Sequence, residues 1–376
     1  MRNENKRATL ETGIEGTTMS DVALPNLRIG VLGAGAISQA AHLEACRKSR
    51  NATLYAICDA AEDLLQAVAA EHQPCATFTD YDQMLADPNV DAVIVAVADQ
   101  LHVAMASKAI AAGKHVLVEK PMGVNVAECE SLAAQVAASG LTLQVGTMRR
   151  FDEGIAYAHD FIAQEIGEVL SMRAWYCDST HRYAITDALQ PLIRTSGVAV
   201  RPPGDPKANR RSYYLLGHAS HLVDTARFLC GDIVSLRAQL VEKFGAFSWF
   251  VGTRFADGSI GHLDLTVSVR MDWFEGFHVY GERGSVIARS FQPWYMRTSE
   301  VECFSESDGV YRRPLGADGH FWRRQVEGFA DTVRGAAPQR GADARDGLAV
   351  VQTLVAIQRS LDTGEEVELA RIVGVV

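Results

Sequence analysis

Two histidines in the second half of the chain have the spacing and the chemistry of a proton-transfer site. His218 and His221 are three residues apart, so in a helix both rings would lie on one face. An imidazole titrates near neutral pH, and such a ring can accept the proton of a hydroxyl while the carbon gives up hydride. A helical histidine without further context is more often structural or simply exposed. The two residues alone leave both interpretations open.

A glycine pattern near the start of the chain predicts a dinucleotide-binding turn. Gly33, Gly35 and Ser38 occupy the three positions of a G-x-G-x-x-G motif, after the apolar run 27–32 and before an expected helix at 36–46. The first glycine permits a tight turn, the second lets the backbone approach a pyrophosphate, and the helix N-terminus favours the phosphate charge. Serine at the third position is slightly larger than the usual Gly or Ala. The residues expected to contact the cofactor here are Gly33, Gly35, Ala36 and Ile37.

Asp59 follows the next expected strand and predicts which dinucleotide binds. It stands 26 residues after Gly33, where a carboxylate can bind both ribose hydroxyls of an adenosine. The same charge would repel a 2′-phosphate, and Ala60 and Ala61 follow instead of an arginine. The sequence therefore favours NAD over NADP. The alternative is a purely structural role, in which the glycines form an ordinary turn and Asp59 caps a helix.

These residues need a scaffold, and the hydrophobic pattern predicts one of two parts. From 27 to 147, short apolar strands alternate with helices, which indicates a doubly wound parallel sheet of the Rossmann type. From 148 to 376, alternating strands and turns such as Asp257-Gly258 indicate a mostly antiparallel sheet covered on one face. The expected class is α/β: a Rossmann domain, a C-terminal α+β domain with an open-faced sheet, and a flexible tail at 1–26. Late helices, expected to pack back on the first domain, are placed at 321–333 and 343–361.

Composition excludes several classes of function. The formal net charge is −10 at pH 7, whereas a nucleic-acid-binding domain normally carries a basic face. No apolar run is long enough for a membrane span. The 7 cysteines are scattered and odd in number, which favours a reducing cytoplasm over a disulfide framework, and no Cys/His set predicts a metal site. We therefore expect a cytoplasmic enzyme with a small-molecule ligand and no metal, nucleic acid or membrane partner.

A more specific signal is the stretch G-K-H-V-L-V-E-K-P at 113–121, which resembles the Gfo/Idh/MocA oxidoreductase family, the relatives of glucose–fructose oxidoreductase and inositol dehydrogenase. Three further stretches match it: G-A-G-A-I-S at 33–38, V-G-T-M-R-R-F at 145–151 and H-L-V-D-T-A-R-F-L at 221–229. The likeness implies a Rossmann domain and an open-faced sheet domain with the substrate between them.

The resemblance also implies roles for residues around this stretch. Lys120 would point at the substrate hydroxyl beside the nicotinamide, where its ammonium stabilises a developing alkoxide. Pro121 often follows a cis peptide in this family, which turns the lysine into the cleft. Glu119 and His102 are expected to contact the cofactor with Lys120. The family's usual Thr-Pro-Asn before that histidine is replaced by Ala98-Asp99-Gln100, so this loop departs from the pattern.

The second half of the implied site resembles the family pattern D-x-G-x-H-x-x-D, with two changes. His221 falls on the family's catalytic histidine, but Gly217 replaces the usual aspartate and Ala219 the usual glycine. The missing carboxylate removes one partner for Lys120 and the substrate, and His218 adds a second titratable group beside it. The expected catalytic residues are Lys120, His221 and His218, and the expected substrate contacts are Lys120, Arg149, Tyr176, His218 and His221. Arg149 and Arg150 could instead pair with acids.

These observations lead to an NAD-dependent dehydrogenase acting on a secondary alcohol of a sugar, glycoside or cyclitol. One alternative is an NAD-dependent glycosidase on the same fold that oxidises its sugar transiently, because such enzymes place a histidine where His218 stands. Another is a non-catalytic NAD-binding regulator, against which the presence of Lys120 counts. The long, arginine-rich segment 176–215 could cover the substrate or form an oligomer contact. A homodimer or homotetramer through the C-terminal sheet is expected.

Overall fold

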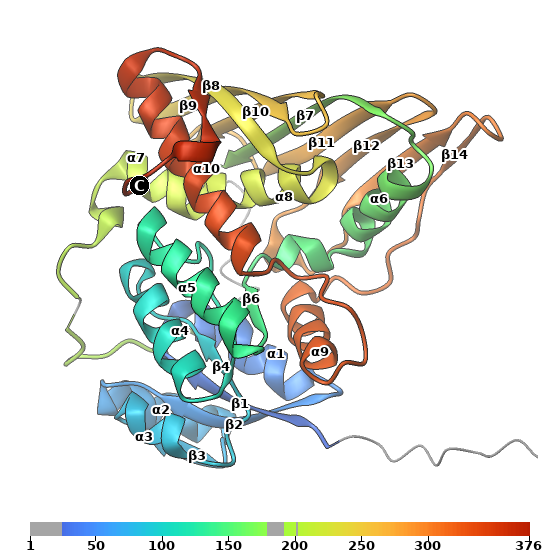
Figure 1. Ribbon diagram of the computed structural model, residues 1–376. Helices are drawn as coiled ribbons and strands as arrows, with labels where there is room; N and C mark the ends of the chain where they lie inside the picture. The colour runs from blue at the N-terminus through green and yellow to red at the C-terminus, as the bar shows by residue number, and fades with distance from the viewer. Residues whose placement is uncertain (1–24, 179–191, 201) are drawn as a thin grey trace, which may run out of the picture.

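A computed structural model describes residues 25–178, 192–200 and 202–376; all but Pro25 and Asn26 of the expected tail lie outside these ranges. Figure 1 shows two layered parts, a smaller parallel sheet with helices on its faces and a broad sheet above it with helices on one face. No helix in the described ranges is long and apolar enough to cross a membrane.

The first sheet has six parallel strands in the order β3-β2-β1-β4-β5-β6, the order of a doubly wound Rossmann sheet. Its strands are nearly continuous apolar runs because helices cover both faces. The strands are β1 Leu27–Leu32, β2 Ala52–Cys58, β3 Ala76–Phe78, β4 Ala92–Val95, β5 His115–Val118 and β6 Leu143–Val145. The helices are η1 Ser38–His42, α1 Leu43–Lys48, α2 Glu62–His72, α3 Tyr81–Ala86, η2 Asp99–Leu101, α4 His102–Ala111 and α5 Val126–Ser139.

The second sheet has nine strands in the order β14-β13-β12-β11-β7-β10-β9-β8-β15. Only β7 and β10 pair in parallel; the other neighbours are antiparallel, so the sheet is mixed but mostly antiparallel, as expected. The strands are β7 Val169–Asp178, β8 Ile233–Lys243, β9 Ala246–Phe255, β10 Ile260–Val267, β11 Phe274–Gly281, β12 Gly284–Ser290, β13 Glu300–Ser305, β14 Val310–Arg312 and β15 Val367–Glu368.

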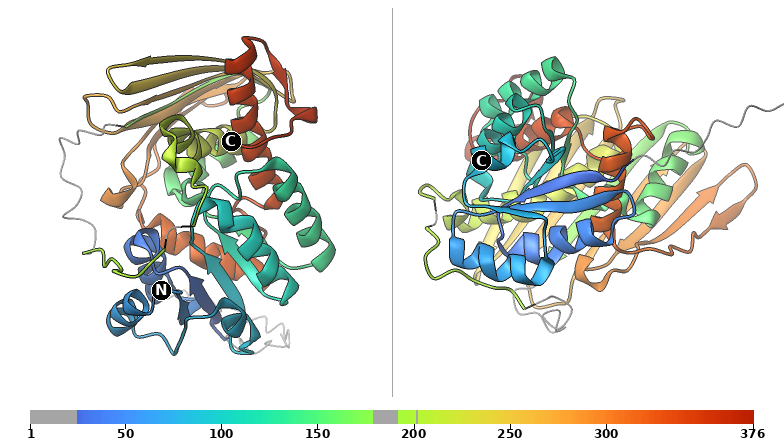
Figure 2. Two further views of the ribbon diagram at one scale, coloured as in Figure 1. Left: turned by 90° about the vertical axis from the view of Figure 1, so that its left-hand side faces the viewer. Right: turned by 90° about the horizontal axis from the view of Figure 1, so that it is seen from below.

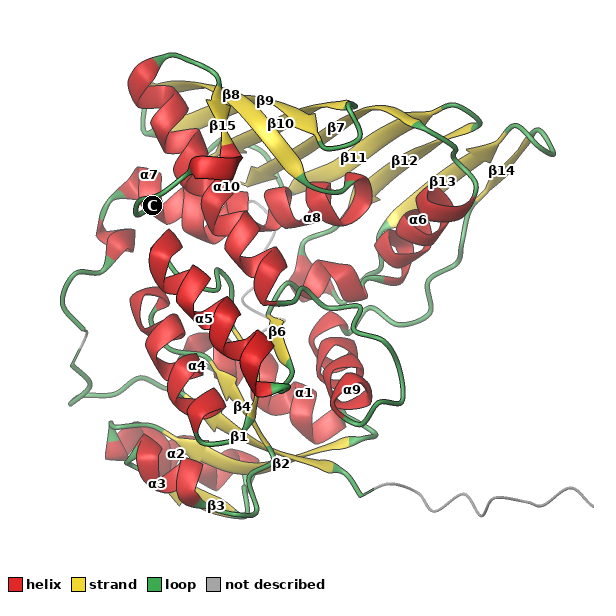
Figure 3. Cartoon of the chain, viewed as in Figure 1, coloured by secondary structure: helices red, strands yellow, loops and turns green. Residues whose placement is uncertain are grey.

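One face of this sheet carries helices and the other does not (Figure 3). Strand β9 shows the division: Trp249 and Val251 are buried beneath the helices, while Phe250 points the other way and is 46% exposed. Ile260 and Ile287, from β10 and β12, are also exposed. The helices of this part are η3 Met148–Phe151, α6 Glu153–Gln164, η5 Pro206–Ala208, α7 Arg210–Tyr214, η6 Leu215–Ala219, α8 Ser220–Cys230, η7 Pro293–Tyr295, α9 Phe321–Val333, α10 Ala344–Thr363 and η8 Leu369–Arg371.

The two late helices return to the first sheet's helices. Helix α9 packs against α1, and α10 packs against α5 as well as β8. Helix α10 begins with a capping box in which Asp343 and Asp346 satisfy each other's backbone N–H groups. These contacts hold the carboxyl edge of the parallel sheet against α8 and η6, which is where the expected site residues lie.

Candidate active site

The glycine turn after β1 is built so that only glycine fits at its first position. Gly33 has φ +94°, and a Cβ there would lie 2.3 Å from the carbonyl oxygen of Ala96. Ser38 does not disturb the turn, since its hydroxyl donates to the Gly33 carbonyl at 2.5 Å. A Cβ on Gly35 would meet nothing within 4 Å, so this part of the turn faces open space. The first turn of the following helix, with Ala36 and Ile37, presents its free N–H groups there.

Asp59 lies beside the same turn and braces it. Its carboxylate accepts hydrogen bonds from the backbone N–H of Ala34 at 2.7 Å and of Ala61 at 2.9 Å. A carboxylate oxygen has two lone pairs, so each can also accept from a ribose hydroxyl. The open glycine turn, the helix N-terminus and this carboxylate together fit the pyrophosphate and ribose of a dinucleotide.

Strand β5 delivers Glu119 and Lys120 to the carboxyl edge of the sheet. The Lys120–Pro121 peptide bond is cis, as the resemblance implied. His102 is buried beneath this turn, with Nδ1 2.7 Å from the Pro121 carbonyl oxygen and Nε2 3.1 Å from that of Val97. Both of its ring nitrogens therefore contact the backbone, so the geometry supports a role in shaping the turn. Its contact with a cofactor stays a prediction.

Two single turns of π-helix hold the Glu119–Lys120 pair from opposite sides. In η1, His42 is fully buried and its Nε2 lies 2.7 Å from Glu119 Oε1. In η6, the carbonyl of Gly217 accepts a hydrogen bond from Lys120 Nζ at 2.9 Å. A π turn widens the helix locally, and such turns are frequent at functional sites. The spacing of apolar residues in the sequence does not reveal such turns. The helix expected at 36–46 is present, with a π turn inside it.

The surroundings of this pair lower the pKa of both groups: they favour the ionised form of Glu119 and disfavour the ammonium form of Lys120. Burial would raise the pKa of the Glu119 carboxyl, but the hydrogen bond from His42 and the charges of His42 and Lys120 hold it below its usual value. Burial lowers the pKa of Lys120; Glu119 and Asp99 oppose this effect, while the positive charge of Lys207 adds to it. Lys120 is thus a more readily deprotonated lysine than one in water.

The two histidines lie beside Tyr176, a buried residue near the end of β7. The ring of His221 is parallel to that of Tyr176, with centroids 6.4 Å apart, and the ring of His218 meets it edge-on at 5.4 Å. His218 Nε2 also lies 3.3 Å from a carboxylate oxygen of Asp178, the last residue of β7. Asp178 is a site residue that the sequence analysis missed, because no spacing rule connects a strand end to a helix 40 residues later.

His221 is held in its neutral form. It is buried, and burial lowers its pKa well below the usual value, with the positive charges of Lys120, Arg149 and His218 acting in the same direction. Its Nδ1 is buried without a hydrogen-bond partner among the described residues. The structure thus brings together a lysine and a neutral imidazole at the edge of the parallel sheet.

The two arginines after β6 both pair with acids. Arg149 is buried, contacts the Glu275 carboxylate and donates to the Phe291 carbonyl at 2.8 Å. This arrangement does not test the predicted contact of Arg149 with the substrate.

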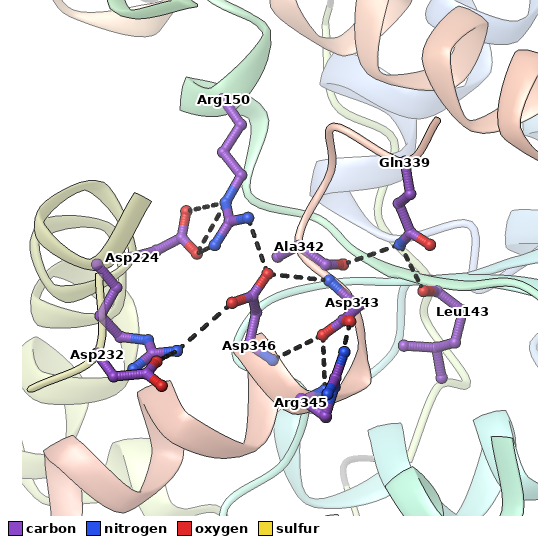
Figure 4. Close-up of polar contacts among 10 residues, drawn as sticks. Leu143, Arg150, Asp224, Asp232, Gln339, Ala342, Asp343, Arg345 and Asp346 are labelled. Atoms are coloured by element: carbon purple, nitrogen blue, oxygen red, sulfur yellow. Dashed lines mark hydrogen bonds and ion pairs between the residues drawn. The ribbon is translucent and has the colours of Figure 1, made fainter. Parts of the chain in front are cut away.

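Arg150 belongs to a separate network, drawn in Figure 4, in which Asp224 and Asp346 bind its guanidinium at 2.8 Å each. Asp224 and Arg150 are almost fully buried. This network joins α8 to α10 and η3, the elements that flank the site, and so fixes the position of the helix that carries His221.

Comparison with known proteins agrees with this architecture. Residues 27–147 match the family model "Oxidoreductase family, NAD-binding Rossmann fold", and residues 156–287 match the Gfo/Idh/MocA C-terminal domain. The chain belongs to the Gfo/Idh/MocA oxidoreductase family. It is an oxidoreductase with an NAD-binding Rossmann fold.

Family members similar to this chain include two curated inositol dehydrogenases. Inositol 2-dehydrogenase 2 of Saccharopolyspora erythraea is 29% identical, over 90% of this chain and 94% of its own length. Myo-inositol 2-dehydrogenase of Thermotoga maritima is 24% identical, over 93% of this chain and 100% of its own length. Among solved structures, levoglucosan dehydrogenase in complex with NADH and L-sorbose has a TM-score of 0.74 at 21% identity, covering 93% of this chain and all of that one. At this identity the structural likeness shows the fold.

Proposed function

We propose that this family member is an NAD-dependent dehydrogenase that acts on a secondary alcohol of a sugar, glycoside or cyclitol. The observation that carries the proposal is the pairing of Lys120, held by Glu119 and the Gly217 carbonyl, with a buried neutral His221. The named relatives that act on inositol, and the one in complex with NADH and a sugar, agree with a polyhydroxylated substrate.

The two side chains would divide the proton chemistry. A bound nicotinamide ring supplies the hydride acceptor. Lys120, as the ammonium, donates a hydrogen bond to the substrate oxygen and stabilises the negative charge that develops there. Neutral His221 accepts the hydroxyl proton as the C–H bond breaks and the carbonyl forms. Its lowered pKa keeps it unprotonated at neutral pH, so the base is ready without prior proton loss.

His218 would assist through Asp178. The family's usual aspartate is absent at 217, and the Asp178 carboxylate lies 3.3 Å from the Nε2 of the next residue, His218. A carboxylate in this position orients an imidazole. We propose that this pair binds a substrate hydroxyl next to the one that reacts.

The cofactor is proposed to be NAD because the negative charge of Asp59, beside the glycine turn, would repel a 2′-phosphate. Two backbone N–H groups hold its carboxylate there. A homodimer or homotetramer through the outer face of the second sheet is also proposed, since Phe250, Ile260 and Ile287 are exposed on that face. Light scattering that shows only a 41-kDa species would refute the oligomer.

The first test is absorbance at 340 nm as the purified protein meets NAD or NADP and a panel of sugars, glycosides, inositols and uronic acids. NADH should accumulate with one substrate class, and Lys120→Met and His221→Gln should lose at least about a thousandfold in kcat/KM. Lys108→Met is the matched control, because Lys108 is exposed and pairs with Asp82 on the surface. Full activity in either site variant would refute the assigned roles.

A second candidate is the redox-cycling glycosidase, which the position of His218 favours. In that case the same panel would release an aglycone or free sugar from a glycoside with no net NADH. The Lys120 and His218 variants would then lose hydrolysis instead of NADH formation.

A further inference from the structure

A segment of the second domain crosses over the first. We name the described residues 192–200 and 202–209 the strap; they precede α7 and lie along one side of the parallel sheet's helices (Figures 1 and 2). The strap makes specific polar contacts at three places on the first domain, and each place borders the carboxyl edge of the parallel sheet. In a doubly wound sheet this edge is where a dinucleotide binds.

The first contact is with the helix that follows the glycine turn. The side-chain amide of Gln39 accepts from the backbone N–H of Arg194 at 2.7 Å and donates to the Arg194 carbonyl at 3.0 Å. The same amide nitrogen donates to the Ala34 carbonyl in the glycine turn at 2.7 Å. Gln39 is buried, so one side chain ties the strap directly to the expected pyrophosphate-binding turn.

The second contact is with the start of α2, four residues after Asp59. Both oxygens of Asp63 are bound by the strap: Oδ1 accepts from the Ser196 hydroxyl at 2.6 Å and Oδ2 from the Gly197 N–H at 2.9 Å. Ser196 also accepts from two following backbone N–H groups, which fixes the strap's own turn. The strap therefore passes beside the carboxylate that is expected to bind the adenosine ribose.

The third contact joins the strap to the loop after β4 and borders a cavity. Lys207 Nζ lies 2.8 Å from Asp99 Oδ1, in the loop where the family's Thr-Pro-Asn is replaced. Between this loop and the strap is a cavity of about 280 Å³, lined by Val97, Ala98, Asp99, Gln100, Pro202, Asp205 and Lys207.

Buried polar atoms of this loop lack partners. Asp99 is 7% exposed, and its Oδ2 is buried without a hydrogen-bond partner among the described residues; the same holds for both amide atoms of Gln100. Because buried polar atoms are normally satisfied, the contact from Lys207, which satisfies the other oxygen of Asp99, is important for this loop.

We propose that the strap completes the dinucleotide site by closing over the bound cofactor, held in place through Gln39, Asp63 and Asp99. This rests on the proposed function, since it takes the ligand to be NAD. The consequence is that the cofactor leaves only when the strap lifts, so release is slow and the protein keeps its cofactor over many turnovers.

The test measures NADH release from the full-length protein. Protein loaded with NADH is mixed with excess NAD in a stopped-flow instrument, and the decay of NADH fluorescence gives the dissociation rate. Ser196→Ala and Lys207→Met each remove one strap contact; because Lys207→Met also removes a charge that acts on Lys120, the readout is NADH release and not turnover. We expect each to raise the rate several-fold, and the double variant to raise it at least about tenfold, because each lost contact removes about one net hydrogen bond or ion pair.

The matched control is Arg211→Met, which removes a cation from the adjoining helix. Arg211 pairs with Glu242 inside the second domain and does not touch the first. Thermal unfolding of all variants checks that they remain folded. Asp99→Asn provides an independent variant, because it weakens the Lys207 contact from the other side.

The outcomes separate the strap from the proposed reaction. A dissociation rate in the double variant within about twofold of the parent overturns the strap's role, and so does faster NADH binding with unchanged release, since the strap would then only obstruct the groove. Faster release in the variants with no hydride transfer from any polyol to NAD supports the strap and overturns the proposed reaction. A parent protein that binds no NADH overturns both.

Discussion

Restoring the missing carboxylate at position 217 should change the titration of Lys120 in a defined direction. Lys120 Nζ donates to the carbonyl of Gly217, and a Cβ at 217 would meet nothing within 4 Å, so an aspartate fits without displacing its neighbours. At about 6 Å, a carboxylate and an ammonium attract each other by roughly 3 kcal/mol at an effective dielectric constant of about 20. Lys120 is partly exposed, so solvent screens part of this attraction. We take half of the attraction to act on the pKa of Lys120, which raises that pKa by roughly one pH unit.

The assay is the pH profile of kcat/KM for NAD reduction. Activity requires the ammonium form of Lys120, so the alkaline limb of the profile follows its pKa, which burial places below the value of a free lysine. Gly217→Asp stabilises the charged form, so the limb should move about one unit to higher pH. Gly217→Asn has nearly the same shape without the charge and should leave the limb in place. Equal limbs in the two variants, or movement to lower pH in Gly217→Asp, would refute the assignment of that limb to Lys120.

Two further predictions concern the same region. Glu119→Gln should move the alkaline limb in the opposite direction, to lower pH, because the Glu119 charge raises the pKa of Lys120; a pH profile checks this, and an unchanged limb would contradict it. Asp224→Asn should lower the free energy of unfolding by about 3 kcal/mol, measured by urea denaturation, because it leaves the buried guanidinium of Arg150 with Asp346 as its remaining carboxylate partner; a loss under about 1 kcal/mol would show that Asp346 suffices.

Much of the fold could be predicted from sequence because its elements carry strong local patterns. The apolar run 27–32 and the helix at 321–333 coincide with β1 and α9, since a buried parallel strand is apolar throughout and an amphipathic helix has a clear period. Strands β13 and β14 were not predicted. Strand β13 alternates in burial, but two of its outward residues are Glu300 and Glu302 and its partner β14 is only three residues long, so the segment resembles a polar loop.

The site was predictable where a motif carries the chemistry and not where residues meet across the fold. Lys120 and His221 lie in stretches that resemble the family, and the structure brings them to one edge of the sheet. Asp178, Gln39 and Lys207 contact the site from separate elements. No rule of spacing links residues that are 40, 155 and 108 positions from their partners. Long-range contacts of this kind depend on the tertiary packing that holds the two domains together.

At each of the two departures from the family pattern, a residue from elsewhere in the chain contacts the changed position or its neighbour. The aspartate missing at Gly217 has a counterpart in Asp178, which reaches the adjacent His218 from the end of β7. The altered loop at Asp99 is matched by Lys207, which reaches it from the strap. Both partners come from the segment 176–215, so changes in two separate motifs coincide with residues of one stretch of the chain. Lys120 and His221 keep the positions that the resemblance implies, so under the proposed function the hydride and proton chemistry is the same while the surroundings of the ligand differ. A substrate or cofactor preference that differs from the inositol dehydrogenases should therefore transfer with this segment rather than with the helix of His221.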